Sequence, residues 1–198
     1  MSILPIYLFG TKVLKKTALP VESLDDSTVK LIYDMFETMH EANGLGLAAT
    51  QVGDLRRVIT IDISDVTEPN AEGETEDTSH PTSPELPKTL ALINPEILIE
   101  DGTWIMEEGC LSIPSLHSEV ERADTVRIRY RDAAFKEQEM LADGLLARVI
   151  LHELDHLNGV LFVDRVSKTR RSLLLPKLRR IRKGELEVDY PVVTAEEE

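Results

Sequence analysis

The stretch DGLLARVILHELDHLNG, residues 143–159, decides the fold. Apolar residues cover most of the circumference of a helix drawn over it, so we predict a buried central helix rather than a surface one. Asp143 is expected as its N-cap and Gly159 as its stop. The apolar residues of this helix are Leu145, Leu146, Val149, Ile150, Leu151, Leu154 and Leu157.

Within this helix, His152 and His156 lie four residues apart. That spacing puts both imidazoles on one face, where they can bind a single metal ion. Glu153 points about 100° round the helix, close enough to act as a general base without ligating the ion. Burying two histidines and a glutamate is costly unless each has a strong partner, which favours a metal site over two core histidines.

A catalytic metal site usually has three protein ligands and one open position. No histidine follows His156, and Glu185 and Glu187 lie beyond a basic segment, so a downstream third ligand is a poor candidate. Cys110, the only cysteine, lies upstream in EGCLS between two segments with extended character. A thiolate with two imidazoles suits Zn(II) or Fe(II). Cys110 is therefore a candidate for the third ligand beside His152 and His156.

The stretch GLGLAATQ, residues 44–51, combines small residues with one amide. Gly44 and Gly46 allow close approach of another backbone, either that of a substrate or that of the central helix. Gln51 carries an amide that can donate to an oxyanion, a role that the metal-site residues leave open.

The three stretches GLGLAATQ, EGCLS and HELDH, in this order, resemble the signature motifs of the peptide deformylases. The resemblance extends from ILPIYLFGTKVL at residues 3–14, which is similar to the family's first strand, to about Val166. It implies an α+β fold with mixed and antiparallel β-sheets around the helix that carries HExxH. It also implies a metal-dependent hydrolase that removes the N-formyl group from the formylmethionine of newly made peptides and releases formate.

The resemblance further implies roles for individual residues. Glu153 would be the acid/base, and the Gln51 side chain with the backbone N–H of Leu111 would form the oxyanion hole. The ligands would be Cys110, His152 and His156. They would hold one divalent metal ion, usually Fe(II) in the family, although Zn(II), Ni(II) or Co(II) can occupy the same ligands.

Substrate binding in the family resembles the addition of a strand. The edge from Gly44 to Gly46 and Gly109 would pair with the peptide backbone. Leu45, Leu145 and Val149 would line the methionine pocket, with plain core packing as the alternative.

The chain departs from the family pattern at two positions. Leu151 stands where a polar residue commonly precedes the first motif histidine, and His117 stands where some relatives have a peptide-binding arginine. Arg122 matches a family arginine, and we expect it to pair with Asp155.

The remaining elements follow from local patterns. A helix is expected from Ser23 to about residue 43, and strands at 57–64, at 89–100 with an interruption at Asn94 and Pro95, at 126–130 and at 135–141. We expect one catalytic domain over residues 1–183, a solvated acidic loop at 65–88, and a partly flexible tail at 184–198.

The segment 168–183 contains eight Lys and Arg residues, no acidic residue, and an apolar face that includes Leu173 and Leu174. Pro176 is expected to break or kink it. Some family members dock on the ribosome through a C-terminal helix, and a basic segment suits an RNA surface. The alternative is an amphipathic helix lying on the domain with its cations in water.

Composition narrows the function further. The formal charge of −14 repels nucleic acid as a whole, so DNA binding is not expected. No apolar run approaches the roughly 20 residues that cross a bilayer, so no membrane partner is expected. The first residues lack the order of a secretory signal, and a single cysteine suits a reducing compartment, so we expect a cytoplasmic protein.

Two rival interpretations remain open from the residues alone. One is a zinc endopeptidase or other amidase with a different third ligand. The other is a binding protein with a purely structural metal, which needs His117 or Asp155 as a fourth ligand.

Overall fold

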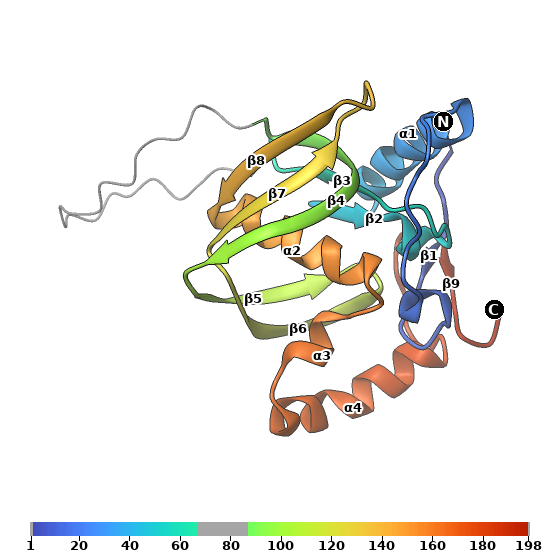
Figure 1. Ribbon diagram of the computed structural model, residues 1–198. Helices are drawn as coiled ribbons and strands as arrows, with labels where there is room; N and C mark the ends of the chain where they lie inside the picture. Colours follow the sequence, from blue (N-terminus) through green and yellow to red (C-terminus); the bar gives the residue numbers. More distant parts are fainter. Residues whose placement is uncertain (1, 67–86, 198) are drawn as a thin grey trace.

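The protein, seen here in a computed structural model, is described over residues 2–66 and 87–197. Figure 1 shows the central helix α2 (Gly144–Leu157) between an antiparallel sheet and a hairpin. The five-stranded sheet has the spatial order β2 (Gly46–Ala48), β3 (Val58–Asp62), β4 (Thr89–Asp101), β7 (Thr125–Arg131), β8 (Glu137–Asp143). The hairpin consists of β5 (Trp104–Cys110) and β6 (Ile113–Arg122). The predicted α+β class is confirmed.

The other elements surround this core. They are β1 (Ile6–Tyr7) and its parallel partner β9 (Val192–Val193), the helices α1 (Asp26–Glu41), α3 (Phe162–Arg165) and α4 (Lys168–Arg182), and the 3-10 turns η1 (Val13–Lys15) and η2 (Ala49–Val52). No helix in the described ranges 2–66 and 87–197 is long and apolar enough to cross a membrane.

Helix α2 is central because its residues from Leu146 to Leu157 are all buried. Asp143 occupies the N-cap position as predicted, although its side chain makes no capping hydrogen bond. Gly159 ends the helix with φ of +73°, and a Cβ there would lie 2.7 Å from the carbonyl oxygen of Lys15. Only glycine fits that left-handed, crowded position.

The structure refines two local predictions, the start of the first helix and the interruption at Asn94. The first helix begins at Asp26 rather than Ser23, because the Asp25 carboxylate accepts a hydrogen bond from the Thr28 N–H at 2.8 Å and caps the helix. The interruption at Asn94 is a bulge within β4, where Asn94 has φ of +52°. Its amide exchanges two hydrogen bonds of 2.8 Å with the backbone of Val21, so the bulge also anchors the chain before α1.

Of the two expected effects of Pro176, the break does not occur, since α4 runs through this residue from Lys168 to Arg182. A proline removes one helical hydrogen bond, but Ser167 caps the helix and Leu178 and Ile181 are buried in the core. The predicted apolar face is only partly correct, because Leu173 is 76% exposed.

Residues 184–198, expected as a tail, include β9, which pairs with β1. In the same segment the Tyr190 hydroxyl donates to the Leu111 carbonyl oxygen at 2.8 Å. The predicted acidic loop at 65–88 lies, apart from its ends, outside the described residues.

Candidate metal centre

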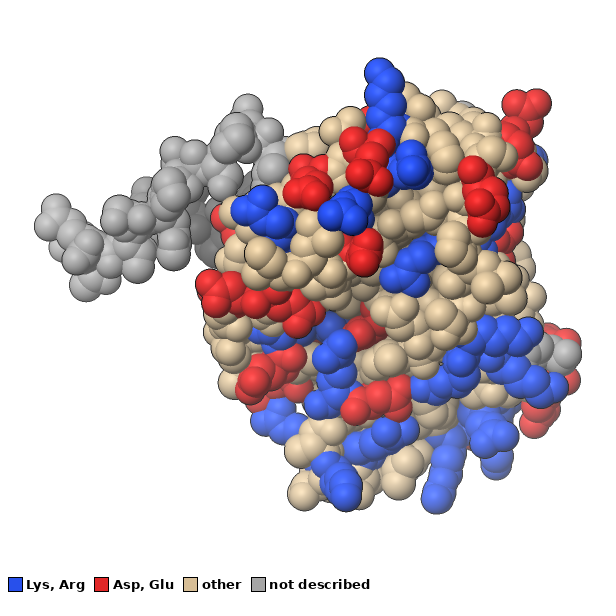
Figure 2. All heavy atoms as spheres, viewed as in Figure 1, with Lys and Arg blue, Asp and Glu red and all other residues tan. Residues whose placement is uncertain are grey.

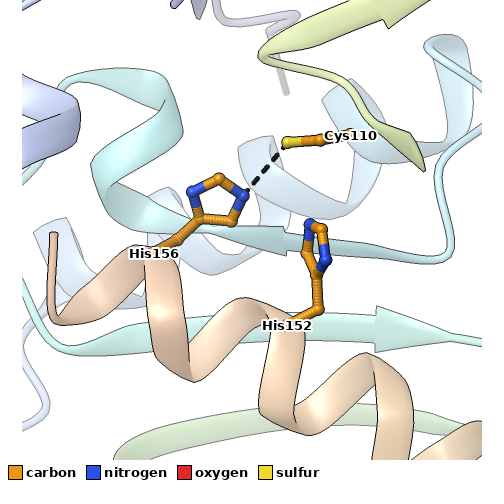
Figure 3. A group of neighbouring side chains, drawn as sticks. All are labelled: Cys110, His152 and His156. Carbon is orange, nitrogen blue, oxygen red and sulfur yellow. Dashed lines mark hydrogen bonds between the residues drawn. The ribbon is translucent and has the colours of Figure 1, made fainter. Parts of the chain in front are cut away.

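Cys110 from the end of β5 meets His152 and His156 from α2, as Figure 3 shows. The three side chains offer ligand atoms that all lie within 4.8 Å of one another. The Cys110 Sγ is 3.1 Å from the Nε2 of His156. One thiol and two imidazoles in this compact arrangement are a donor set that fits a divalent ion such as Zn(II) or Fe(II).

The orientation of His152 is fixed by Glu108. Its Nδ1 lies 2.9 Å from the Glu108 Oε2, which leaves Nε2 as the nitrogen available to an ion. Burial alone would lower the pKa of His152, but its hydrogen bonds with Cys110 and Glu108 raise that pKa to about 10. Burial lowers the pKa of His156 well below its usual value.

Glu108 is the centre of a buried ionic cluster. Its Oε1 accepts from Arg122 Nε and from Arg148 Nη1, both at 2.6 Å, and its Oε2 accepts from Arg122 Nη2 at 2.9 Å. Although burial opposes ionisation, the hydrogen bonds from His152 and Arg122 lower the pKa of Glu108. The carboxylate therefore remains charged and holds its partners in place.

The cluster extends along α2 to Asp155. Arg122 donates to Asp155 at 2.7 Å, which confirms the pair expected from the sequence, and Arg165 binds the same carboxylate. Arg148 donates to the carbonyl oxygens of Val120 and Trp104, on both strands of the hairpin. The hairpin that carries Cys110 is thus fastened to the helix that carries both histidines.

Glu153 lies beside the three ligands and is 4% exposed. Burial raises its pKa to about 7, a value suited to accepting and returning a proton near neutral pH. Its Oε2 is buried and has no hydrogen-bond partner among the described residues, so one acceptor is free to face a water or substrate. A Cβ at Gly46 would lie 2.7 Å from the Glu153 Oε1, so any larger residue here would displace this carboxylate.

Gln51 is positioned by both ends of its amide. Its Oε1 accepts from the Ala48 N–H at 2.8 Å, and its Nε2 lies 3.7 Å from the Cys110 Sγ and 3.3 Å from the Ser112 Oγ. The donor end of the amide is therefore directed toward the cysteine.

A cavity of about 610 Å³ brings the predicted site together. All the predicted site residues line it except His156, which lies behind the other ligands at 1% exposure. The lining residues among them are Gly44, Leu45, Gly46, Gln51, Gly109, Cys110, Leu111, Leu145, Val149, His152 and Glu153. The metal-ligand group in the described part of the chain includes neither His117 nor Asp155, the fourth ligands that a closed structural site needs.

Sequence reasoning missed Glu108, Arg148 and Tyr190. Arg148 is four residues before His152, on the same face of α2, so helical spacing contained the signal for it. Glu108 is two residues before Cys110, but the register of β5 shifts between them, so strand alternation did not predict its place. Tyr190, which lines the cavity, carried no local signal because it reaches the site only through the pairing of β9.

Comparisons with known proteins show the family of this chain. A family model described as polypeptide deformylase matches residues 3–172. A peptide deformylase of Salinibacter ruber is 46% identical over 99% of this chain and 97% of its own length. A peptide deformylase of Chlorobium phaeovibrioides is 42% identical over 98% of this chain and 94% of its own length.

Solved structures give the same result. A peptide deformylase from Legionella pneumophila has a TM-score of 0.76 with 37% identity and covers 92% of this chain and 97% of that one. A peptide deformylase from Ehrlichia chaffeensis, solved in complex with actinonin, has a TM-score of 0.76 with 34% identity. That match covers 94% of this chain and 100% of the other.

Proposed function

This chain belongs to the polypeptide deformylase family, and on that premise we propose how its own residues remove the formyl group from the formylmethionine of newly made peptides. The reaction is the hydrolysis of a linear formamide, with formate and a free amino terminus as products. The observation that supports the assignment most strongly is the meeting of Cys110, His152 and His156 beside the buried Glu153 in one cavity.

The proposed ligands are Cys110, His152 and His156. A divalent ion held by them supplies Lewis acidity toward the formyl oxygen and toward water. We propose Fe(II) as the native ion, with Zn(II), Ni(II) or Co(II) able to replace it. Metal analysis of protein purified without oxygen tests this choice.

Glu153 is proposed to move the proton. It accepts a proton from water as the water oxygen attacks the formyl carbon, and it passes that proton to the leaving amine as the C–N bond breaks. Its pKa of about 7 supports both halves of this cycle. The Gln51 amide and the Leu111 N–H donate to the carbonyl oxygen as negative charge builds on it, and losing one such donor typically costs about 10² to 10³ in rate.

The peptide is proposed to bind in extended form, with its backbone against the edge from Gly44 to Gly46 and against Gly109. Leu45, Leu145 and Val149 are proposed to receive the methionine side chain. Their position along the cavity that contains Glu153 supports this arrangement.

The decisive experiment compares two variants with the wild type in a formate-release assay on formyl-Met-Ala-Ser. Glu153→Gln is expected to retain the ion and lose turnover, whereas Cys110→Ser is expected to lose the ion. Unchanged formate release by Glu153→Gln would remove the basis for the acid/base role. Metal retained by Cys110→Ser would instead favour a site with another third ligand.

We also propose that α4 contacts ribosomal RNA weakly and that the enzyme works in the cytoplasm, where newly made peptides arise. Figure 2 shows Lys and Arg side chains gathered over the part of the surface where Figure 1 places α4. Such a cluster in a chain of net charge −14 supports a local attraction to phosphate. Sedimentation with ribosomes at increasing salt tests it, with Arg179→Glu and Arg180→Glu expected to abolish binding.

A further inference from the structure

A groove of about 560 Å³ lies between the β5–β6 hairpin and α4. Figure 1 shows α4 running beside this hairpin. We call this groove the distal groove and define it by Ile105, Ser118, Glu119, Arg170, Leu173 and Leu174. Arg170 and Glu119 form an ion pair that joins α4 to β6 within it.

The distal groove adjoins the catalytic cavity, with which it shares three lining residues. Met106, Glu107 and His117 line both spaces. Cys110 lies five residues further along β5 from Ile105. At about 3.3 Å per residue of strand, that separation is roughly 17 Å, which an extended peptide also spans with about five residues.

The distal groove exposes large apolar side chains that have no cover within the described chain. Leu173 is 76% exposed and Ile105 58%, on opposite sides of the groove, and Met106 at the junction with the cavity is 37% exposed. Apolar side chains gathered beside a binding cleft indicate an interaction surface.

We propose that the distal groove binds the downstream part of the substrate chain, at about the fifth to eighth residues after the formylmethionine, and prefers apolar side chains there. This inference rests on the proposed function, because the peptide must enter from the catalytic cavity. The shared lining of the two spaces is the reason to choose the substrate over another occupant. We expect contacts in the groove to lower KM and to leave kcat unchanged, as contacts made equally in the ground state and the transition state do.

The test measures formate release by the metal-loaded enzyme on three substrates. One is formyl-Met-Ala-Ser, and the others are nine-residue peptides with the same start and either Leu and Val or Ser and Gly at positions five to eight. The apolar nine-residue peptide is expected to have a KM about tenfold lower than the other two, since one or two apolar side chains become buried, with an unchanged kcat.

Leu173→Asp and Ile105→Asp are expected to remove this preference while leaving the kinetics of formyl-Met-Ala-Ser unchanged. Leu141→Asp, on β8 at 46% exposure, is the matched control and should keep the preference. Equal KM values for the two nine-residue peptides would overturn the inference. So would a wild-type dimer that Leu173→Asp converts to a monomer, because a second copy would then fill the groove. Failure of the wild type on formyl-Met-Ala-Ser would refute the proposed function instead.

Discussion

Replacing Arg148 with methionine tests the ionic cluster that joins the hairpin to α2. Arg148 is 3% exposed, and its Nη1 lies 2.6 Å from Glu108 and 3.1 Å from the Val120 carbonyl oxygen. Its guanidinium carbon also lies 4.8 Å from the centre of the Trp104 ring. Arg148→Met keeps a similar length and removes all of these polar contacts.

The expected loss of stability follows from these contacts. Removing one partner of a buried ion pair costs about 3–5 kcal/mol. Glu108 keeps Arg122 and His152 as partners, so we expect the lower end, about 3 kcal/mol. For a chain of this size that corresponds to a fall in Tm of roughly 6–12 °C. Metal affinity is expected to fall about tenfold, because Glu108 orients His152 less firmly.

The assay is thermal and urea unfolding of the metal-loaded protein, with metal affinity measured by competition with a chelator. Arg148→Lys should recover part of the stability, because an ammonium can still pair with Glu108 but cannot reach all the acceptors. Arg129→Met, at a surface arginine with a side chain 42% exposed, is the control and should change stability by less than about 0.5 kcal/mol. A Tm for Arg148→Met within about 2 °C of the wild type would refute the reasoning.

Three further predictions concern the site and its surroundings. Gly46→Ala is expected to lower kcat/KM by at least about 100-fold with little loss of stability, because its Cβ would displace Glu153; wild-type kinetics would contradict this. Although burial opposes it, hydrogen bonds from Ser64 lower the pKa of Asp62 to about 2, so this carboxylate stabilises the fold above pH 3.8 and the effect disappears as the pH falls toward 2. Asp62→Asn should therefore be less stable than the wild type at pH 7 and equally stable below pH 2 in urea unfolding, and an equal loss at both would be inconsistent. A chelator should abolish formate release and strip the ion more readily at pH 6 than at pH 8, because protonation of His152 competes with metal binding; a pH-independent rate of metal loss would argue against that competition.

The fold and the centre of the site were accessible from sequence because they depend on local spacing. Helix α2 is apolar on most of its surface, and the histidine spacing within it fixes which side chains share a face. The three motifs also predicted that Cys110 lies beside His152 and His156, as it does in the structure. The helix and the individual motifs were predictable because the residues that define each of them are close in sequence.

The contacts that connect distant segments were not accessible. Nothing near Leu173 indicates that the neighbouring hairpin leaves it exposed, and nothing near Tyr190 indicates that β9 carries it to the cavity. The course of α4 through Pro176 is set by the burial of Leu178 and Ile181 against residues far away in the chain. Tertiary packing decides such features, and local preference only biases them.

The contact of Glu108 with His152 has a consequence for how the enzyme acquires its ion. Glu108, which is itself bound by Arg122, orients the imidazole from outside the ligand triangle, so the ligand geometry depends on protein contacts rather than on the ion's own bonding. Exchange of one divalent ion for another then requires only access through the cavity, without refolding. The ion found in a preparation would accordingly reflect which divalent ions the folded enzyme last encountered.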